Sequence, residues 1–156
     1  MRGLEKPVEH AAFAAVRNPD DASVLLVERP ESDDELGGMW GLPARPIGTT
    51  EGVAEAVRRV GTDKLGVELD VGDFLGRGVI DREAYLLHGE LYEATLASGT
   101  PTVPQSDTDA PGTQYVEWRW VSDDEVADEI REIARHGSLC TNLYLDHLGE
   151  QAFLDG

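Results

Sequence analysis

The sequence predicts an α/β protein: an α/β/α sandwich in which helices cover both faces of a mixed β-sheet. Two observations favour this fold class. Apolar residues first form strand-length runs, then a run at helical spacing, then further strand-length runs and two helical runs at the end. The length of 156 residues is that of one ordinary domain with a sizeable core. We therefore expect residues 1–156 to form a single domain.

The first half of the chain predicts strands followed by a helix. Residues 10–17 and 23–29 are apolar runs separated by a turn, and an acidic loop then leads to a strand at Trp40. A helix is expected from about Glu51, with the hydroxyl of Thr49 or Thr50 as its cap. Its core-facing residues are Val53, Ala54, Ala56, Val57 and Val60.

The second half predicts more strands and two helices. Strands are expected at residues 67–75 and 84–96, and the glycines at 76 and 78 between them indicate a turn or a bulge. A long polar loop follows at residues 98–112, then a strand at residues 115–121. Helices are expected at residues 126–136 and 139–148, with Ser122 and Glu125 forming a capping box before the first.

The charge of the chain restricts its partners. The formal net charge is −18, from 31 acidic and 13 basic residues, and Lys6 and Lys64 are the only lysines. This composition resembles that of proteins from salt-loving cytoplasms, in which salt screens the repulsion among carboxylates. An acidic surface repels nucleic acid and anionic membranes, so we expect neither as a partner.

Cysteine content and hydropathy indicate a cytoplasmic protein. Cys140 is the only cysteine, which excludes an internal disulfide and a cysteine zinc cluster. No segment has the length and hydropathy of a signal peptide or a membrane span. The oligomeric state stays open, with a homodimer among the alternatives.

The most informative stretch is residues 39–67, which joins a strand end, a glycine-containing loop and the first helix. Glu55, Arg59 and Asp63 are spaced four apart and would form one row on that helix, either as a working face or as a solvated row of ion pairs. This layout resembles the box of the Nudix (MutT-like) hydrolase family: glycine, five residues, glutamate, seven residues, then Arg-Glu-apolar-any-Glu-Glu-any-Gly-apolar. The box glutamate falls on Glu51, the arginine on Arg59 and the closing pair on Gly66-Val67.

Several box positions depart from the family pattern. Arg45 replaces the first glycine, Val60 replaces the glutamate after the arginine, Gly61 replaces the apolar residue, and Asp63-Lys64 replaces the final glutamate pair. In the family these glutamates hold Mg²⁺ or Mn²⁺, which prefer oxygen ligands. Glutamates at positions 60 and 64 are expected to restore two such ligands on the face that carries Asp63.

The resemblance implies candidate site residues. Glu51, Arg59 and Asp63 would be catalytic, and Glu51, Glu55 and Asp63 would be metal ligands together with Glu93, or alternatively Glu90, from a later strand. Arg29, Arg45 and Trp118 would bind substrate. Independently of the resemblance, the polar loop would either cover the pocket and offer Asp107 or Asp109, or be a flexible surface linker. For the arginines the alternative is a surface ion pair, and for Trp118 and Trp120 it is core packing.

The resemblance implies one of two functions. The first is hydrolysis of a nucleoside diphosphate linked to another moiety, by metal-assisted attack of water and weakened by the altered box. The second is a catalytically inactive nucleotide-binding or regulatory module of the same fold. In both cases the expected ligand is a small-molecule nucleotide.

Gly61 is expected to weaken the helix, because glycine inside a helix costs about 1 kcal/mol relative to alanine. Gly61→Ala should therefore stabilise the protein, unless that face of the helix lies against another backbone.

Overall fold

The strands form one mixed sheet. The computed structural model describes residues 6–31, 36–103 and 114–153. In those residues seven strands form a sheet with the order β3-β2-β1-β6-β5, while β4 pairs with β1 and β7 pairs with β2. The strands are β1 (Val8–Arg17), β2 (Val24–Glu28), β3 (Trp40–Gly41), β4 (Ala44–Pro46), β5 (Glu68–Asp81), β6 (Leu86–Ser98) and β7 (Glu117–Val121). The sheet is mixed because β1 runs parallel to β6 and antiparallel to β2 and β4.

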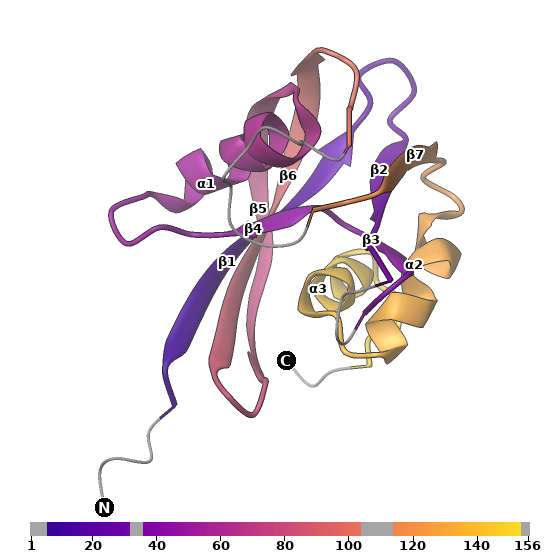
Figure 1. Ribbon diagram of the computed structural model, residues 1–156. Helices are drawn as coiled ribbons and strands as arrows, with labels where there is room; N and C mark the ends of the chain where they lie inside the picture. The colour runs from indigo at the N-terminus through magenta and orange to yellow at the C-terminus, as the bar shows by residue number, and fades with distance from the viewer. Residues whose placement is uncertain (1–5, 32–35, 104–113, 154–156) are drawn as a thin grey trace, which may run out of the picture.

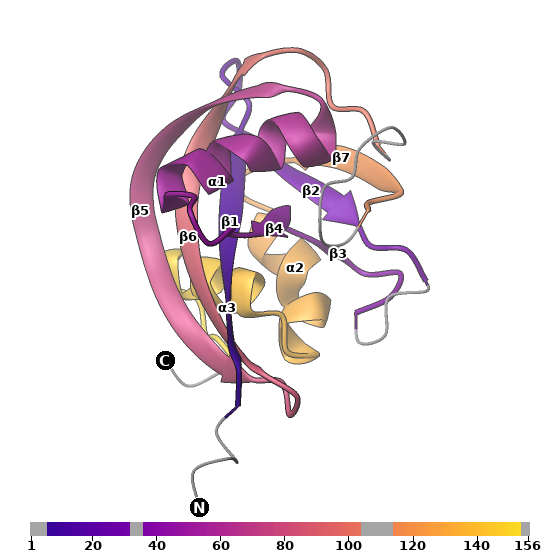
Figure 2. The same ribbon diagram turned by 60° about the vertical axis from the view of Figure 1, so that its left-hand side comes forward.

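Helices cover both faces of this sheet (Figures 1 and 2). The helix α1 (Val53–Arg59) and its continuation η1 (Val60–Leu65) lie on one face. The helices α2 (Val126–Arg135) and α3 (Leu139–His147) lie on the other. The predicted α/β/α sandwich around a mixed sheet is confirmed.

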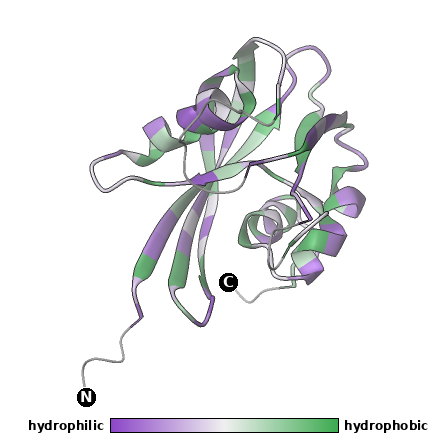
Figure 3. Cartoon of the chain, in the orientation of Figure 1, coloured by the Kyte–Doolittle hydropathy of each residue, from purple (hydrophilic) through white to green (hydrophobic). Residues whose placement is uncertain are grey.

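Alternation along β1 explains why both faces are apolar. Ala12 and Ala14 pack with α1 and η1 in one core cluster, whereas Phe13 and Ala15 pack with α2 and α3 in the other. A central strand buried on both sides needs apolar residues at every position, and this accounts for the continuous run in the sequence. Figure 3 shows the matching pattern on α2, which is hydrophilic on the side turned away from the sheet.

The strand after the box is longer than predicted. Instead of ending near Gly76, β5 continues to Asp81. Its pairing with β6 has three register shifts, between Glu68 and Leu69, between Val71 and Phe74, and between Phe74 and Gly76. Of the two alternatives for these glycines, the bulge is correct and the turn is wrong. Gly78 has a packing role, since a Cβ there would lie 3.0 Å from Leu139 Cδ1 of α3.

Both predicted helix caps are wrong. The residue before α1 is Gly52, and no side chain caps its first turn. The N-cap of α2 is Glu125, because the Ser122 carbonyl accepts hydrogen bonds from the N–H groups of Glu125 and Val126 in a turn that precedes the helix. Among the helices of the described residues, α3 alone has a side-chain cap, in which Ser138 accepts a hydrogen bond from the N–H of Thr141.

Within the described part of the chain, no helix is long and apolar enough to cross a membrane.

Candidate functional site

The helix that carries the box changes its winding in the middle. The α-helical turns end at Arg59, and residues Val60–Leu65 form a π-helix that Gly66 closes in the left-handed conformation, with φ of 70°. Short π-helical turns within helices are frequent at functional sites. The wider turn moves Asp63 out of the expected row: Arg59 forms an ion pair with Glu55 at 3.0 Å, but Asp63 pairs with Arg45 of β4.

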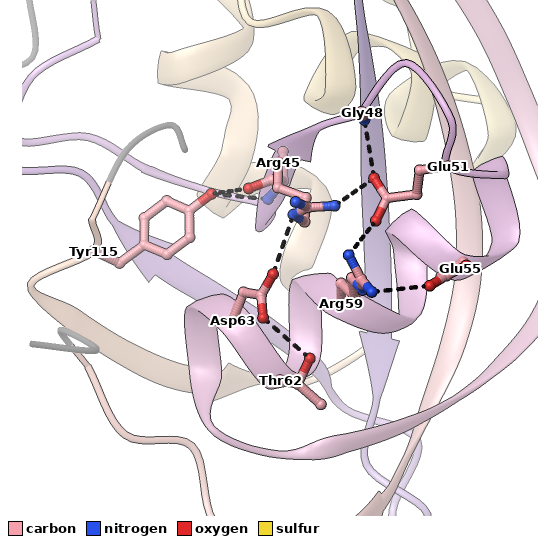
Figure 4. A network of polar contacts seen from close by, with 9 residues as sticks. Arg45, Gly48, Glu51, Glu55, Arg59, Thr62, Asp63 and Tyr115 are labelled. Carbon is pink, nitrogen blue, oxygen red and sulfur yellow. Dashed lines mark hydrogen bonds and ion pairs between the residues drawn. The ribbon is translucent and has the colours of Figure 1, made fainter. Parts of the chain in front are cut away.

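Glu51 lies at the centre of this site, between two arginines (Figure 4). Its Oε1 accepts hydrogen bonds from Arg45 at 2.7 Å and from the N–H of Gly48 at 3.0 Å, and its Oε2 accepts one from Arg59 at 3.0 Å. Burial by itself would raise the pKa of Glu51, but the Gly48 N–H and the two arginines hold this pKa below its ordinary value. The carboxylate is therefore ionised at neutral pH, and both of its oxygens already accept hydrogen bonds.

Arg45 is fixed between the carboxylates of Glu51 and Asp63. Its strand β4 pairs with β1 at Ala12, and the hydroxyl of Tyr115 both accepts from the N–H of the preceding Ala44 at 2.8 Å and donates to its carbonyl at 3.2 Å. The Arg45 side chain is 7% exposed, and its Nε lies 3.5 Å from Asp63 Oδ2. This Nε makes no hydrogen bond within the described residues.

Val60 and Lys64 are both buried, at 0% and 1% exposure. Val60 packs in the core cluster beneath α1, so a glutamate at that position would place a carboxylate in an apolar environment. The pKa of Lys64 is lowered to about 8, chiefly by burial of the ammonium and also by the charges of Arg45 and Arg29, while Asp63 opposes the shift. The structure thus places a lysine where the family has a carboxylate.

These residues do not fit the divalent cation that the family uses. The oxygens of Glu51 accept from arginines, the arginine of β4 separates Glu51 from Asp63, and a buried ammonium adjoins them. Among the described residues, no group of three or more histidine, cysteine or acidic side chains could hold a metal ion. The arrangement instead pairs these carboxylates with basic side chains: Arg45 and Arg59 form ion pairs with Glu51, Glu55 and Asp63, and the charge of Arg29 contributes to lowering the pKa of Lys64.

The other predicted carboxylates that the structure describes lie outside this cluster. Glu93 pairs with Arg17 at 3.3 Å, and its alternation with Tyr92 puts it on the face covered by α2 and α3, away from Glu51. Glu90, two residues before Tyr92, shares the face of α1. Asp107 and Asp109 lie outside the described residues.

The predicted substrate-binding residues other than Arg45 come from β2 and β7. Arg29 directly follows β2, and its positive charge contributes to lowering the pKa of Lys64. Trp118 and Trp120 are half-buried and pack against the core cluster beneath α1. Tyr115 was not singled out in the sequence, and the only signal for it is its place just before the strand that pairs with β2.

The fold and the box together identify the family. The profile of the NUDIX domain matches residues 8–139, and the chain therefore belongs to the Nudix family, whose members include the MutT-type hydrolases. No curated protein matches the sequence.

Solved structures of the family have the same fold. A Nudix hydrolase from Nitrosomonas europaea is 21% identical, with a TM-score of 0.66 over 96% of this chain and 95% of that one. The MutT protein of Methanosarcina mazei Go1 is 20% identical, with a TM-score of 0.64 over 83% and 92% of the two chains. A UDP-X diphosphatase is 12% identical, with a TM-score of 0.63 over 96% of this chain and 66% of that chain.

Proposed function

We propose that this Nudix-family protein binds a small nucleotide derivative that contains a diphosphate, and that it hydrolyses this ligand weakly or not at all. The observation that carries the proposal is the position of Arg45 between Glu51 and Asp63, next to the buried Lys64. The arrangement keeps a fold of nucleotide-derivative hydrolases but replaces carboxylates of the box with basic or apolar side chains. The UDP-X diphosphatase among the structural neighbours supports the ligand class, since its name describes cleavage of a nucleoside diphosphate derivative.

The physical reason for weak hydrolysis is electrostatic. Metal-assisted attack at phosphorus requires carboxylate oxygens that are free to bind the cation. Glu51 is bound to two arginines, and a cation at contact distance from the Lys64 ammonium would be opposed by roughly 1 to 4 kcal/mol in a wet or surface-like environment. Asp63, which is 30% exposed, is the remaining box carboxylate close to this centre.

A double substitution tests the proposal. Arg45→Gly with Lys64→Glu restores the family residues at two positions without placing a charge in the core at Val60. We expect calorimetry to show tighter Mn²⁺ binding by this variant, and phosphate release from a panel of nucleoside diphosphate derivatives to exceed that of the natural sequence. The matched control is Arg77→Gly with Lys6→Glu, which makes the same changes of residue and charge away from the box and should leave both measurements unchanged.

The opposite results distinguish the alternatives. Strong Mn²⁺-dependent turnover by the natural sequence that disappears in Asp63→Ala would establish the metal-assisted hydrolase and overturn the proposal of weak hydrolysis. Strong turnover that survives both Asp63→Ala and Glu51→Ala would show that the chemistry lies outside this cluster.

A further inference from the structure

The cluster around Arg45 is more basic than the rest of the protein. The whole chain carries a net charge of −18, yet Arg29, Arg45, Arg59 and Lys64 meet three carboxylates here: Glu51, Glu55 and Asp63. Burial strengthens the effect of the charges on Arg45, Glu51 and Lys64, because water screens them less. An anion that approached this acidic molecule would meet several basic side chains at this cluster.

Arg45 has hydrogen-bonding capacity left for such an anion. The guanidinium presents five N–H donors in a planar fork that matches the oxygens of a phosphate. One nitrogen donates to Glu51 at 2.7 Å, while the buried Nε has only the longer contact of 3.5 Å to Asp63 and makes no hydrogen bond in the described residues. A buried donor without a hydrogen bond is unfavourable, and a ligand oxygen that accepted from it would remove that penalty.

Asp63 is the group that a ligand would displace. Its side chain is partly exposed, and its contacts are long: 3.5 Å to Arg45 and 3.4 Å to the hydroxyl of Thr62. Glu51, in contrast, is buried and held by three hydrogen bonds of 3.0 Å or less. Asp63 can therefore turn towards solvent while Glu51 keeps Arg45 in place.

The positions of these basic residues match the change in the box. Relative to the family pattern, the glycine becomes Arg45, one glutamate becomes Lys64 and another becomes the neutral Val60. Each replacement makes the local charge more positive. The protein thus supplies from its own side chains the positive charge that other family members take from a bound cation.

We propose that Arg45 and Lys64 bind the diphosphate group of the nucleotide directly, in exchange for Asp63 and without a divalent metal ion. This inference rests on the proposed function, because it assigns how the same site holds its ligand. It differs from metal-bridged binding in the role of Asp63. Here Asp63 competes with the ligand, whereas in metal-bridged binding it would hold the ion that holds the ligand.

Calorimetry with nucleoside diphosphates and with inorganic pyrophosphate separates the two modes. Titrations are made at one fixed KCl concentration, first with EDTA and then with excess Mn²⁺, because screening changes all of these affinities. We expect affinities in EDTA to lie within about threefold of those in Mn²⁺. Asp63→Ala should tighten binding about fivefold or more, and Lys64→Met should weaken it about tenfold, or about 1.4 kcal/mol.

Arg58→Met is the matched control, since Arg58 is exposed on the same helix and should be neutral. Thermal unfolding shows whether each variant folds. If Lys64→Met does not fold, the expected increase in the affinity of Asp63→Ala for the ligand tests the inference. Binding that requires Mn²⁺, or that is lost in Asp63→Ala, would overturn this inference and leave the proposed function standing. Absence of binding by every probe in both conditions would overturn the proposed function as well.

Discussion

The substitution Gly61→Ala tests how closely the box helix is packed. Gly61 lies in η1, where alanine would ordinarily favour the helix by up to about 1 kcal/mol. A Cβ at this position would lie 2.6 Å from Leu69 Cγ and 2.8 Å from the carbonyl oxygen of Val67. The helix face is pressed against another backbone, which is the exception stated for the sequence-based expectation of stabilisation.

The steric clash of the added Cβ decides whether Gly61→Ala stabilises or destabilises the protein. Overpacking a well-filled core costs about 1 to 3 kcal/mol, and relief here requires movement of the backbone because the Val67 N–H donates to the Gly61 carbonyl at 3.0 Å. We expect a net loss of about 1 to 2 kcal/mol in the free energy of unfolding, or about 2 to 8 °C in Tm for a domain of this size.

Urea unfolding measures this loss, provided that the variant and the natural protein have the same slope of unfolding free energy against urea concentration. Ala54 is exposed on α1, so its predicted core-facing position is wrong. Ala54→Gly is therefore the control for helix propensity and should cost about 1 kcal/mol. Leu69→Ala in the Gly61→Ala background should reduce the effect of the alanine, since it removes one of the two contacts. A Gly61→Ala variant as stable as the natural protein would refute the packing argument.

Three further predictions concern stability. Tm should rise with KCl from millimolar to molar concentration, because salt screens repulsion in a chain of net charge −18; a flat or falling Tm would remove the halophilic interpretation. Glu51→Gln should destabilise the protein by about 3 to 5 kcal/mol in urea unfolding at neutral pH, because it removes the buried negative charge that pairs with Arg45. Because folding lowers the pKa of Glu51, the ionised carboxylate stabilises the protein above the unfolded pKa near 4.5, and this stabilisation is lost as the pH falls through the folded pKa. Glu51→Gln should therefore lose less free energy of unfolding on acidification than the natural protein. Equal losses in the two proteins would contradict this argument. Asn142→Ala should cost about 1 to 3 kcal/mol, since the buried amide donates to the Ala134 and Ser138 carbonyls and accepts from the Phe153 N–H, and a change under about 0.5 kcal/mol would show that water replaces it.

The sequence predicted the order of the elements because apolar periodicity reports burial directly. The runs around Ala12, Leu25 and Trp120 became strands, and the C-terminal helices ended where glycine and apolar spacing indicated. The starts of the last two helices at Val126 and Leu139 were predicted correctly. The two predicted caps were wrong because hydroxyl groups at Thr49 and Ser122 are only local signals.

The candidate site was predicted in part, because the motif and the helical spacing are both visible in the sequence. The motif located Glu51, Arg59, Asp63 and Arg45, and spacing gave the Glu55–Arg59 pair. Spacing of four residues assumes an α-helix throughout, so it could not place Asp63 beside Arg45 after the π-helical turn. Nor could it show that Glu93 faces the opposite side of the sheet, because that depends on the register of β6 against β1.

The position of β1 also affects how the chain reaches this structure. β1 is synthesised before the other described strands, yet its parallel neighbour β6 begins 78 residues later, as the pairing of Val8 with Leu86 shows. Closing so long a loop loses chain entropy before any contact of the pair forms, and folds dominated by such distant pairings form slowly. During synthesis one side of the alanine-rich β1 stays without its partner until β6 has been made. A dense shell of carboxylates would keep such unfinished chains apart from one another in the meantime.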